Sequence, residues 1–412
     1  MNKVNSFTGV RGEKKNVPFI LFSLILLDSL VSYFSNTLIG VVYPINALTC
    51  GLFLVYAFNN HQFFVRYRPS NLVMVMLGLV LIGFLLGTYH NYYSFTAKIF
   101  KTFSALLSFL IGYYAFRQIN NERQLSAIFI IVGAIYTLVC FVAVLRLAPG
   151  LFPVIDALWA DGWTIVSRPE VTTDQNFQVY YLFFFCFSLF FRIPNLIKLF
   201  VLFGILLALY SLSQLQTRSG IILYAAAILL SVFGGARIKT INPFYILIIG
   251  FVAFFVVVYK MDAIYGMANY LIDRFVNDDY RNLQGRVKSA SYVIDLFVNP
   301  IAWFLPQGLG VFERTFGGLP HSNYTALFLE GGMFTFVGFL ALQLFPIFRV
   351  SLLFVKYRLD AVTIAALFGA LVSLVGSLSL CVPYHEHIYL WMGALIGAEL
   401  RLRHINNLRR KK

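Results

Sequence analysis

Runs of about 17 to 25 apolar residues recur from one end of this chain to the other, and they constrain its fold more than any other feature. A helix needs about 20 such residues to cross the roughly 30 Å hydrocarbon layer of a bilayer. The composition agrees, because 59% of the 412 residues are hydrophobic and 12% are charged, against about a quarter charged in soluble domains. The sequence predicts one all-α, polytopic integral-membrane domain over residues 1–412.

Hydropathy divides the chain into about twelve predicted transmembrane helices. Two predicted outer loops are long, residues 148–175 and residues 260–322, and the second separates the ninth helix from the tenth. This second loop contains a predicted amphipathic helix, Arg286–Phe297, of the kind that lies on a membrane surface. The predicted helices are about 17–34, 37–57, 71–89, 95–116, 124–147, 176–191, 197–215, 219–235, 243–259, 323–348, 361–381 and 386–400.

The positions of the basic residues predict the orientation of these helices. Most of the 32 Lys and Arg residues flank the apolar runs at every second connection, and basic residues accumulate on the cytoplasmic side of membrane proteins. Both termini are therefore predicted to be cytoplasmic. The net charge of +15 does not indicate nucleic acid, because the basic residues are spread thinly over short segments and form no stripe.

A few basic residues remain on the predicted outer side, where orientation does not explain them. Arg218 interrupts a long apolar stretch, and a guanidinium at hydrocarbon depth costs about 2.5 to 3.5 kcal/mol unless it meets a partner or water. The alternative there is a snorkelling arginine in a tight turn. Snorkelling is also the favoured interpretation for Lys98 and Lys101, which share one face near the outer end of the predicted fourth helix. The other candidates in outer loops are Arg168, Arg274, Arg281 and Arg286.

His321 stands just before the predicted tenth helix, where Ser322 or Asn323 is a suitable N-cap. Arginines converging beside such a histidine suit a phosphate group, because guanidinium binds phosphate oxygens in a bidentate fork. Imidazole exchanges a proton near neutral pH. Capping without chemistry is the alternative for His321. Asp278 and Asp279 are adjacent loop carboxylates without a supporting His or Cys cluster, so no metal site and no cofactor are predicted.

Three blocks, in this order, resemble the superfamily of bacterial O-antigen polymerases and O-antigen ligases. They are Gln216–Gly220 with Arg218, then Gly285-Arg286 leading to Asn299-Pro300 and Gly308–Gly310, then His321–Asn323 through Glu330–Gly332. Many relatives read His-Asn at the third block, whereas this chain reads His321-Ser322-Asn323. The resemblance covers roughly residues 175–400, and the N-terminal half matches only in hydropathy.

This resemblance implies a metal-independent glycosyl transfer at the periplasmic face of the bacterial inner membrane. An undecaprenyl diphosphate-linked oligosaccharide would be the donor, held among membrane lipids, and an acceptor glycan or the lipid A core would receive it. Arg218 and Arg286 would bind the leaving diphosphate, and His321 would orient or deprotonate the acceptor hydroxyl. Arg274 and Arg281, then Lys98, Lys101 and Arg168, are secondary candidates for the diphosphate.

The acceptor distinguishes the two activities. The outer loop from about Gly150 to Asn176 resembles that of polymerases and so favours this activity, with a chain-length regulator as an expected protein partner. A ligase acting on the lipid A core is the alternative. A transporter or flippase of lipid-linked oligosaccharide is the alternative from another class, because it also fits twelve helices with cytoplasmic termini. The short predicted connection Arg192–Lys198 and the long outer loop before the tenth helix argue against it.

Overall fold

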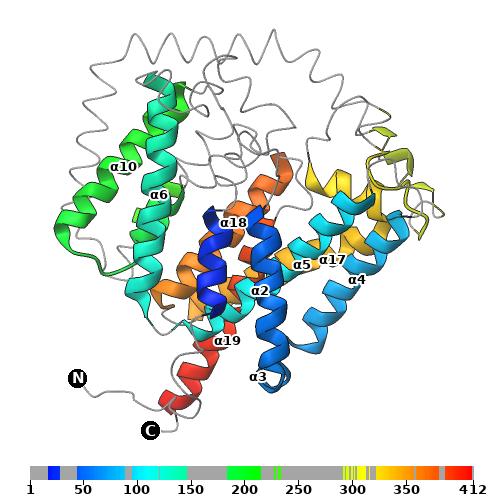
Figure 1. The fold of residues 1–412 in the computed structure, drawn as a ribbon, viewed down its shortest axis with the longest axis horizontal. Helices are drawn as coiled ribbons and strands as arrows, with labels where there is room; N and C mark the ends of the chain where they lie inside the picture. The colour runs from blue at the N-terminus through cyan, green and yellow to red at the C-terminus, as the bar shows by residue number, and fades with distance from the viewer. Residues whose placement is uncertain are drawn as a thin grey trace.

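In the computed structural model, the residues that can be described form helices joined by turns, and none of them forms a strand (Figure 1). These residues are 17–27, 44–88, 95–119, 121–145, 183–214, 227–228, 231–232, 291–292, 294–296, 298–299, 301, 304–311, 315, 322–356, 359–379 and 386–410. The main helices are α2 (Pro44–Asn59), α3 (His61–Arg66), α4 (Asn71–Gly87), α5 (Phe95–Gln118), α6 (Glu122–Leu145), α10 (Asn195–Gln214), α17 (Asn323–Lys356), α18 (Ala361–Ser379) and α19 (Glu386–Arg410).

Glycines bring α5 and α19 into close contact in the middle of the bundle (Figure 1). A Cβ atom added at Gly393 would lie 1.9 Å from the carbonyl oxygen of Phe109, and one at Gly397 would lie 2.2 Å from that of Tyr113. These two glycines form a Gly-x-x-x-Gly pair, which lets two helix backbones approach closely. The interface therefore depends on the absence of side chains at these positions.

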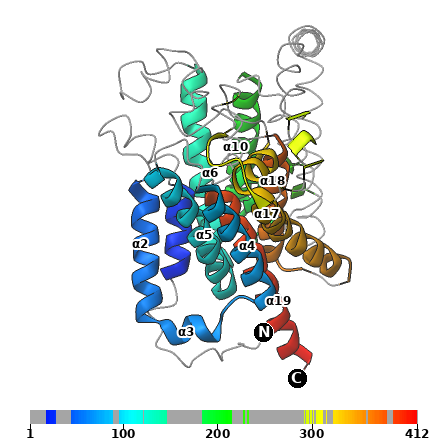
Figure 2. The same cartoon turned by 90° about the vertical axis from the view of Figure 1, so that its right-hand side faces the viewer.

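Glycines also bring α4 and α17 into close contact, and Figure 2 shows these two helices side by side. A Cβ atom at Gly87 would lie 2.0 Å from the Glu330 carbonyl oxygen, and one at Gly83 would lie 2.2 Å from the Thr335 hydroxyl. Gly83 and Gly87 again are four residues apart, on one face of α4. The helix begins at Ser70, whose hydroxyl accepts a hydrogen bond from the Val73 amide at 3.4 Å as an N-cap.

An aromatic cluster around Trp391 of α19 connects several helices. Its ring contacts Phe22 of the helix Val17–Leu27, Phe116 of α5, Phe129 of α6 and Phe187, with centroids 5.4 to 6.0 Å apart. Most of these pairs are edge-on or tilted, the geometries that aromatic quadrupoles favour. The core of the described bundle therefore lies where α5, α6 and α19 meet.

The helix α17 is two helices folded back on each other. Gly332 has φ 69° and ψ −166°, which breaks the helical path and suits glycine alone. The rings of Phe328 and Phe336 lie 6.0 Å apart, and those of Tyr324 and Phe339 lie 5.9 Å apart. Each pair joins a residue before Gly332 to one at about the same distance after it. Residues 323–331 therefore run antiparallel to the first turns of residues 333–356.

This reversal corrects one prediction, because residues 323–348 do not form a single straight helix. A straight helix would place positions 323 and 343 about 30 Å apart, yet both contact Ser377. Gln343 lies eleven residues beyond Gly332, or about 16 Å along the second helix. The N-terminus of the first helix is thus inside the bundle, well away from the bend.

Basic residues from separate segments gather at one end of the bundle, near the start of α18. Arg117 donates a hydrogen bond to the Tyr67 carbonyl oxygen at 3.2 Å, and Arg401 donates to that of Ile119 at 3.2 Å. Arg401 also pairs with Asp360. Burial lowers the pKa of the Arg401 guanidinium to about 10, although the nearby negative charge of Glu122 opposes this shift. Arg401 thus stays protonated at pH 7.

Ion pairs also hold the ends of α17 and α19 together there. Both Arg349 and Arg403 lie 2.8 Å from one carboxylate oxygen of Glu399, whose side chain is almost fully buried. The four arginines named here belong to segments predicted to be cytoplasmic. The grouping agrees with the predicted orientation, which stays a prediction.

The all-helical prediction is confirmed for the described residues, whereas the number of spans is not. Seven predicted spans correspond to helices with shifted ends, namely α2, α4, α5, α6, α10, α18 and α19. By length and composition, the one described helical segment long and apolar enough to cross a membrane is Asn323–Leu353 of α17, which is broken at Gly332, and five shorter apolar helices accompany it. The predicted spans at 219–235 and 243–259 lie mostly or wholly outside the described residues.

Candidate functional site

Most of the residues predicted to carry chemistry lie outside the described residues. The backbones of Lys98 and Lys101 belong to the first half of α5, and their side chains are not described. The other predicted site residues, all outside, are Arg168, Arg218, Arg274, Arg281, Arg286 and His321. Their mutual geometry stays a prediction, so the site is built here from the described residues that flank them.

A tight loop at residues 307–310 is anchored to α17 and to the end of α4. The amide of Gln307 donates to the Leu329 carbonyl oxygen at 2.9 Å, and the amide of Leu309 donates to that of Gly87 at 3.2 Å. The amide of Gly310 donates to the Glu330 carboxylate at 2.9 Å. Glu330 is 5% exposed. The second and third sequence blocks therefore meet through this contact, which joins residues 20 positions apart in the chain.

Glycine is required in this loop for conformational reasons. Gly308 has φ 101° and Gly310 has φ 79°, a region that side chains with a Cβ atom rarely adopt. The turn directs the Gly310 amide at the Glu330 carboxylate. The pattern Gly308-Leu-Gly310 thus has a local structural reason, independent of any chemistry.

A buried polar network lies at the N-terminus of α17, directly after His321 in sequence. The Asn323 side-chain amide donates to the Ser377 hydroxyl at 3.2 Å, and the Gln343 amide donates to the same hydroxyl at 3.1 Å. Tyr324 donates its hydroxyl hydrogen to the Gln343 carbonyl oxygen. Asn323, Gln343 and Ser377 are at most 1% exposed. The network fixes residues 322–324 against α18.

A second buried polar contact joins α5 to the start of α19. The Ser104 hydroxyl donates to the Glu386 carboxylate at 3.0 Å, and both side chains are at most 3% exposed. Lys101 precedes Ser104 by three residues, so the two positions share one face of α5. The ring of Tyr389, three residues after Glu386, lies 5.5 Å from that of Phe339, which lies 5.9 Å from the ring of Tyr324. Polar groups from α5, α17, α18 and α19 therefore occupy one region of the bundle.

Sequence reasoning did not single out Ser104, Gln343, Ser377 or Glu386. A usable signal existed, because polar residues inside apolar helices are costly unless they are paired and so mark interior or functional positions. Glu386 stands between His385 and His387 at the start of the last predicted helix. Partner choice, in contrast, depends on which helices pack together, and one sequence does not reveal this.

Part of the predicted amphipathic helix is described, and residues 291–292, 294–296 and 298 are helical. Tyr292 and Leu296 pack against Val311 and Leu329. Ile294 and Val298, on the other side, are 60% and 75% exposed. The segment therefore has one face packed on the protein and one apolar face that the described residues leave uncovered.

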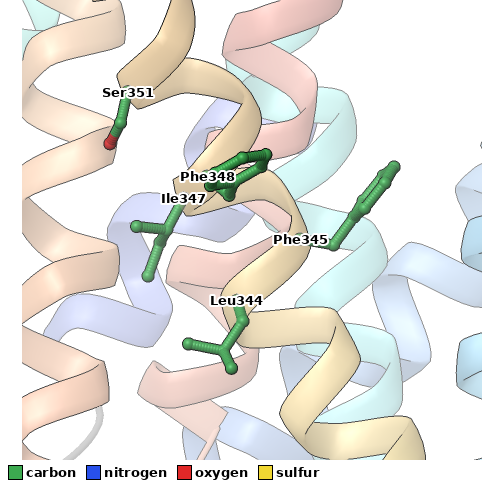
Figure 3. A pocket seen from close by; sticks show the side chains of 5 residues that line it. All are labelled: Leu344, Phe345, Ile347, Phe348 and Ser351. Atoms are coloured by element: carbon green, nitrogen blue, oxygen red, sulfur yellow. The ribbon is translucent and has the colours of Figure 1, made fainter.

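An open hollow of about 480 Å³ lies on the second helix of α17, around Pro346. Figure 3 shows Ile347 and Ser351 on one side of the helix and Phe345 on the other. Apolar side chains line this hollow, with Ser351 as the one polar lining residue. It contains no charged group for a diphosphate, so it is no candidate for that site.

Among the described residues, no group of three or more His, Cys, Asp or Glu side chains could hold a metal ion. Comparison with protein-family models, with curated proteins and with solved structures finds no match for this chain. The features that bear on function are therefore the three sequence blocks and the contacts among the described residues.

Proposed function

We propose that this protein is a membrane glycosyltransferase that polymerises undecaprenyl diphosphate-linked repeat units of an O-antigen at the periplasmic face of the inner membrane. The observation that carries the proposal is the contact between Gly310 and Glu330, 2.9 Å from amide to carboxylate. It joins two of the three blocks that resemble the O-antigen polymerase and ligase superfamily. Asn323, from the third block, stands seven residues before Glu330 in α17 and belongs to the buried polar network.

The distribution of polar and apolar side chains supports a place in the membrane. Large apolar side chains are exposed in the middle of several helices, for example Val55 of α2 at 59%, Val75 of α4 at 59% and Phe203 of α10 at 63%. Buried positions, in contrast, include Asn323 and Glu386. Polar groups in a membrane protein face the bundle interior, where they pair with one another. A water-exposed surface of this kind would aggregate.

The proposed reaction forms one bond and breaks one. The acceptor hydroxyl oxygen attacks the anomeric carbon of the lipid-linked glycan, and the bond from that carbon to the diphosphate oxygen breaks. His321 accepts the hydroxyl proton, and undecaprenyl diphosphate leaves with both electrons of the broken bond. Arg218 and Arg286 stabilise its negative charge through bidentate hydrogen bonds. No metal is required for this charge balance.

Purified protein in nanodiscs, supplied with lipid-linked repeat units, tests the proposal. Wild type should lengthen the glycan, while Arg218→Lys and Arg286→Lys should each lose nearly all transfer, because an ammonium cannot reproduce the planar fork. Arg123→Lys is the matched control, since Arg123 is exposed and belongs to a predicted cytoplasmic connection. Transfer only when lipid A core is the acceptor would identify a ligase. Full activity of both site variants would refute the assigned roles.

A transporter of lipid-linked oligosaccharide is the second candidate, and the break in α17 favours it. Broken helices whose N-termini lie within the bundle are a feature of secondary transporters. The two proposals differ in product. A transporter moves the lipid-linked unit across the bilayer unchanged, whereas the polymerase releases undecaprenyl diphosphate, which chromatography of the nanodisc lipids would detect.

A further inference from the structure

Ser377 occupies an unusual position in the last turn of α18. Its hydroxyl accepts hydrogen bonds from the Asn323 and Gln343 side-chain amides and donates one to the Ser373 carbonyl oxygen at 2.8 Å. A hydroxyl has one donor and two acceptor sites, so all three are used. The group is fully buried. No other orientation of this hydroxyl would satisfy the same three partners.

The backbone of Ser377 is also bound by the segment that follows His321. The Ser322 hydroxyl donates to the Ser377 carbonyl oxygen at 3.4 Å. This carbonyl lies in the last turn of a helix, where carbonyl groups lack intrahelical partners. Two consecutive residues, Ser322 and Asn323, are therefore tied to one residue of α18. The start of α17 cannot shift without breaking one of these contacts.

We propose that Ser377 is a positioning residue, which sets the place of His321 by holding Ser322 and Asn323. The inference rests on the proposed function, in which His321 receives the proton of the acceptor hydroxyl. Ser377 itself takes no part in the proton transfer. Gln343, oriented by Tyr324, fills the second acceptor site of Ser377 and so limits rotation of its hydroxyl.

The chain offers a matched control one turn earlier. Ser373 is 1% exposed, and its hydroxyl donates to the Gly369 carbonyl oxygen of its own helix at 2.8 Å. Ser373→Ala therefore removes a buried hydroxyl from α18 without touching the described contacts to α17. Ser377→Ala removes the acceptor of both amides, and Ser377→Thr keeps a hydroxyl there.

The kinetic test measures transfer by these variants in nanodiscs. Ser377→Ala should lower kcat about 10²-fold, the effect of displacing a reacting group by about 1 Å, with KM for the lipid-linked donor unchanged. Ser377→Thr should restore at least half of the wild-type kcat, and Ser373→Ala should retain it. Unchanged kcat in Ser377→Ala, or an equal loss in Ser373→Ala, would overturn the proposal.

A second test needs no activity. His321→Cys is labelled with a water-soluble maleimide, and the rate above that of the unsubstituted chain is compared in the Ser377→Ala and Ser373→Ala backgrounds. Loss of the buried hydrogen bonds should raise the rate about fivefold or more with Ser377→Ala only. Equal rates would overturn the inference. If wild type performs no transfer, the proposed function fails, and this labelling result alone then decides whether Ser377 positions residue 321.

Discussion

Replacing Glu330 tests how the loop at residues 307–310 is held. In Glu330→Ala, the Gly310 amide loses a carboxylate acceptor at 2.9 Å in a buried environment. Leaving a buried donor without its acceptor costs about 1 to 3 kcal/mol. The two backbone hydrogen bonds of Gln307 and Leu309 remain, so the loop should open locally while the bundle stays folded.

Hydrogen–deuterium exchange of the peptide covering residues 304–311 measures this opening. A cost of about 1 to 3 kcal/mol corresponds to exchange roughly 5 to 160 times faster when local opening controls the rate. Glu330→Gln keeps an oxygen acceptor and should show a smaller increase. Glu122→Ala, at an exposed position at the other end of the bundle, should leave the exchange of this peptide unchanged. Unaltered exchange in Glu330→Ala would refute the anchoring role of Glu330.

Three further predictions concern other parts of the bundle. Gly397→Leu should separate α5 from α19 and lower the yield of folded protein measured by gel filtration in detergent, because a Cβ there meets the Tyr113 carbonyl oxygen at 2.2 Å; Gly78→Leu, with open space around it, should not. Glu399→Ala should cost up to about 3 kcal/mol, seen as a lower Tm, because Arg349 and Arg403 lose their common carboxylate; an unchanged Tm would contradict this. A nitroxide at position 298 should be relaxed more by oxygen than by a water-soluble nickel chelate, as expected for a membrane-facing residue, while one at the exposed position 123, in a predicted cytoplasmic connection, should respond more to the chelate; equal behaviour would contradict the surface-helix prediction.

The long apolar helices could be predicted from the sequence, because a continuous apolar run has few alternatives to a helix in a bilayer. The second helix of α17, α18 and the first half of α19 follow directly from such runs. The reversal at Gly332 could not, because only Glu330 and a Gly-Gly pair interrupt the apolar run there, and apolar residues continue on both sides. A Gly-Gly pair permits a turn without requiring one, and tertiary contacts such as Tyr324 with Phe339 decide the outcome.

The residues of the candidate site could likewise be predicted only in part from the sequence. Arginine and histidine on the outer side attract attention because charge near hydrocarbon is costly, and their sequence order supports the resemblance. The residues that hold the flanking segments, such as Ser377 and Gln343, gain their meaning only from partners distant in sequence. Ser377 lies 54 residues from Asn323, and no local pattern connects the two.

The most direct test of the central claim is the ladder of surface glycans from a strain that lacks this protein, separated on a polyacrylamide gel. The strain is complemented with wild type or with His321→Ala. Our account predicts that wild type restores the full ladder, whereas the deletion strain and the His321→Ala strain show only core with a single repeat unit. An unaltered ladder in the deletion strain would contradict the proposed polymerase activity.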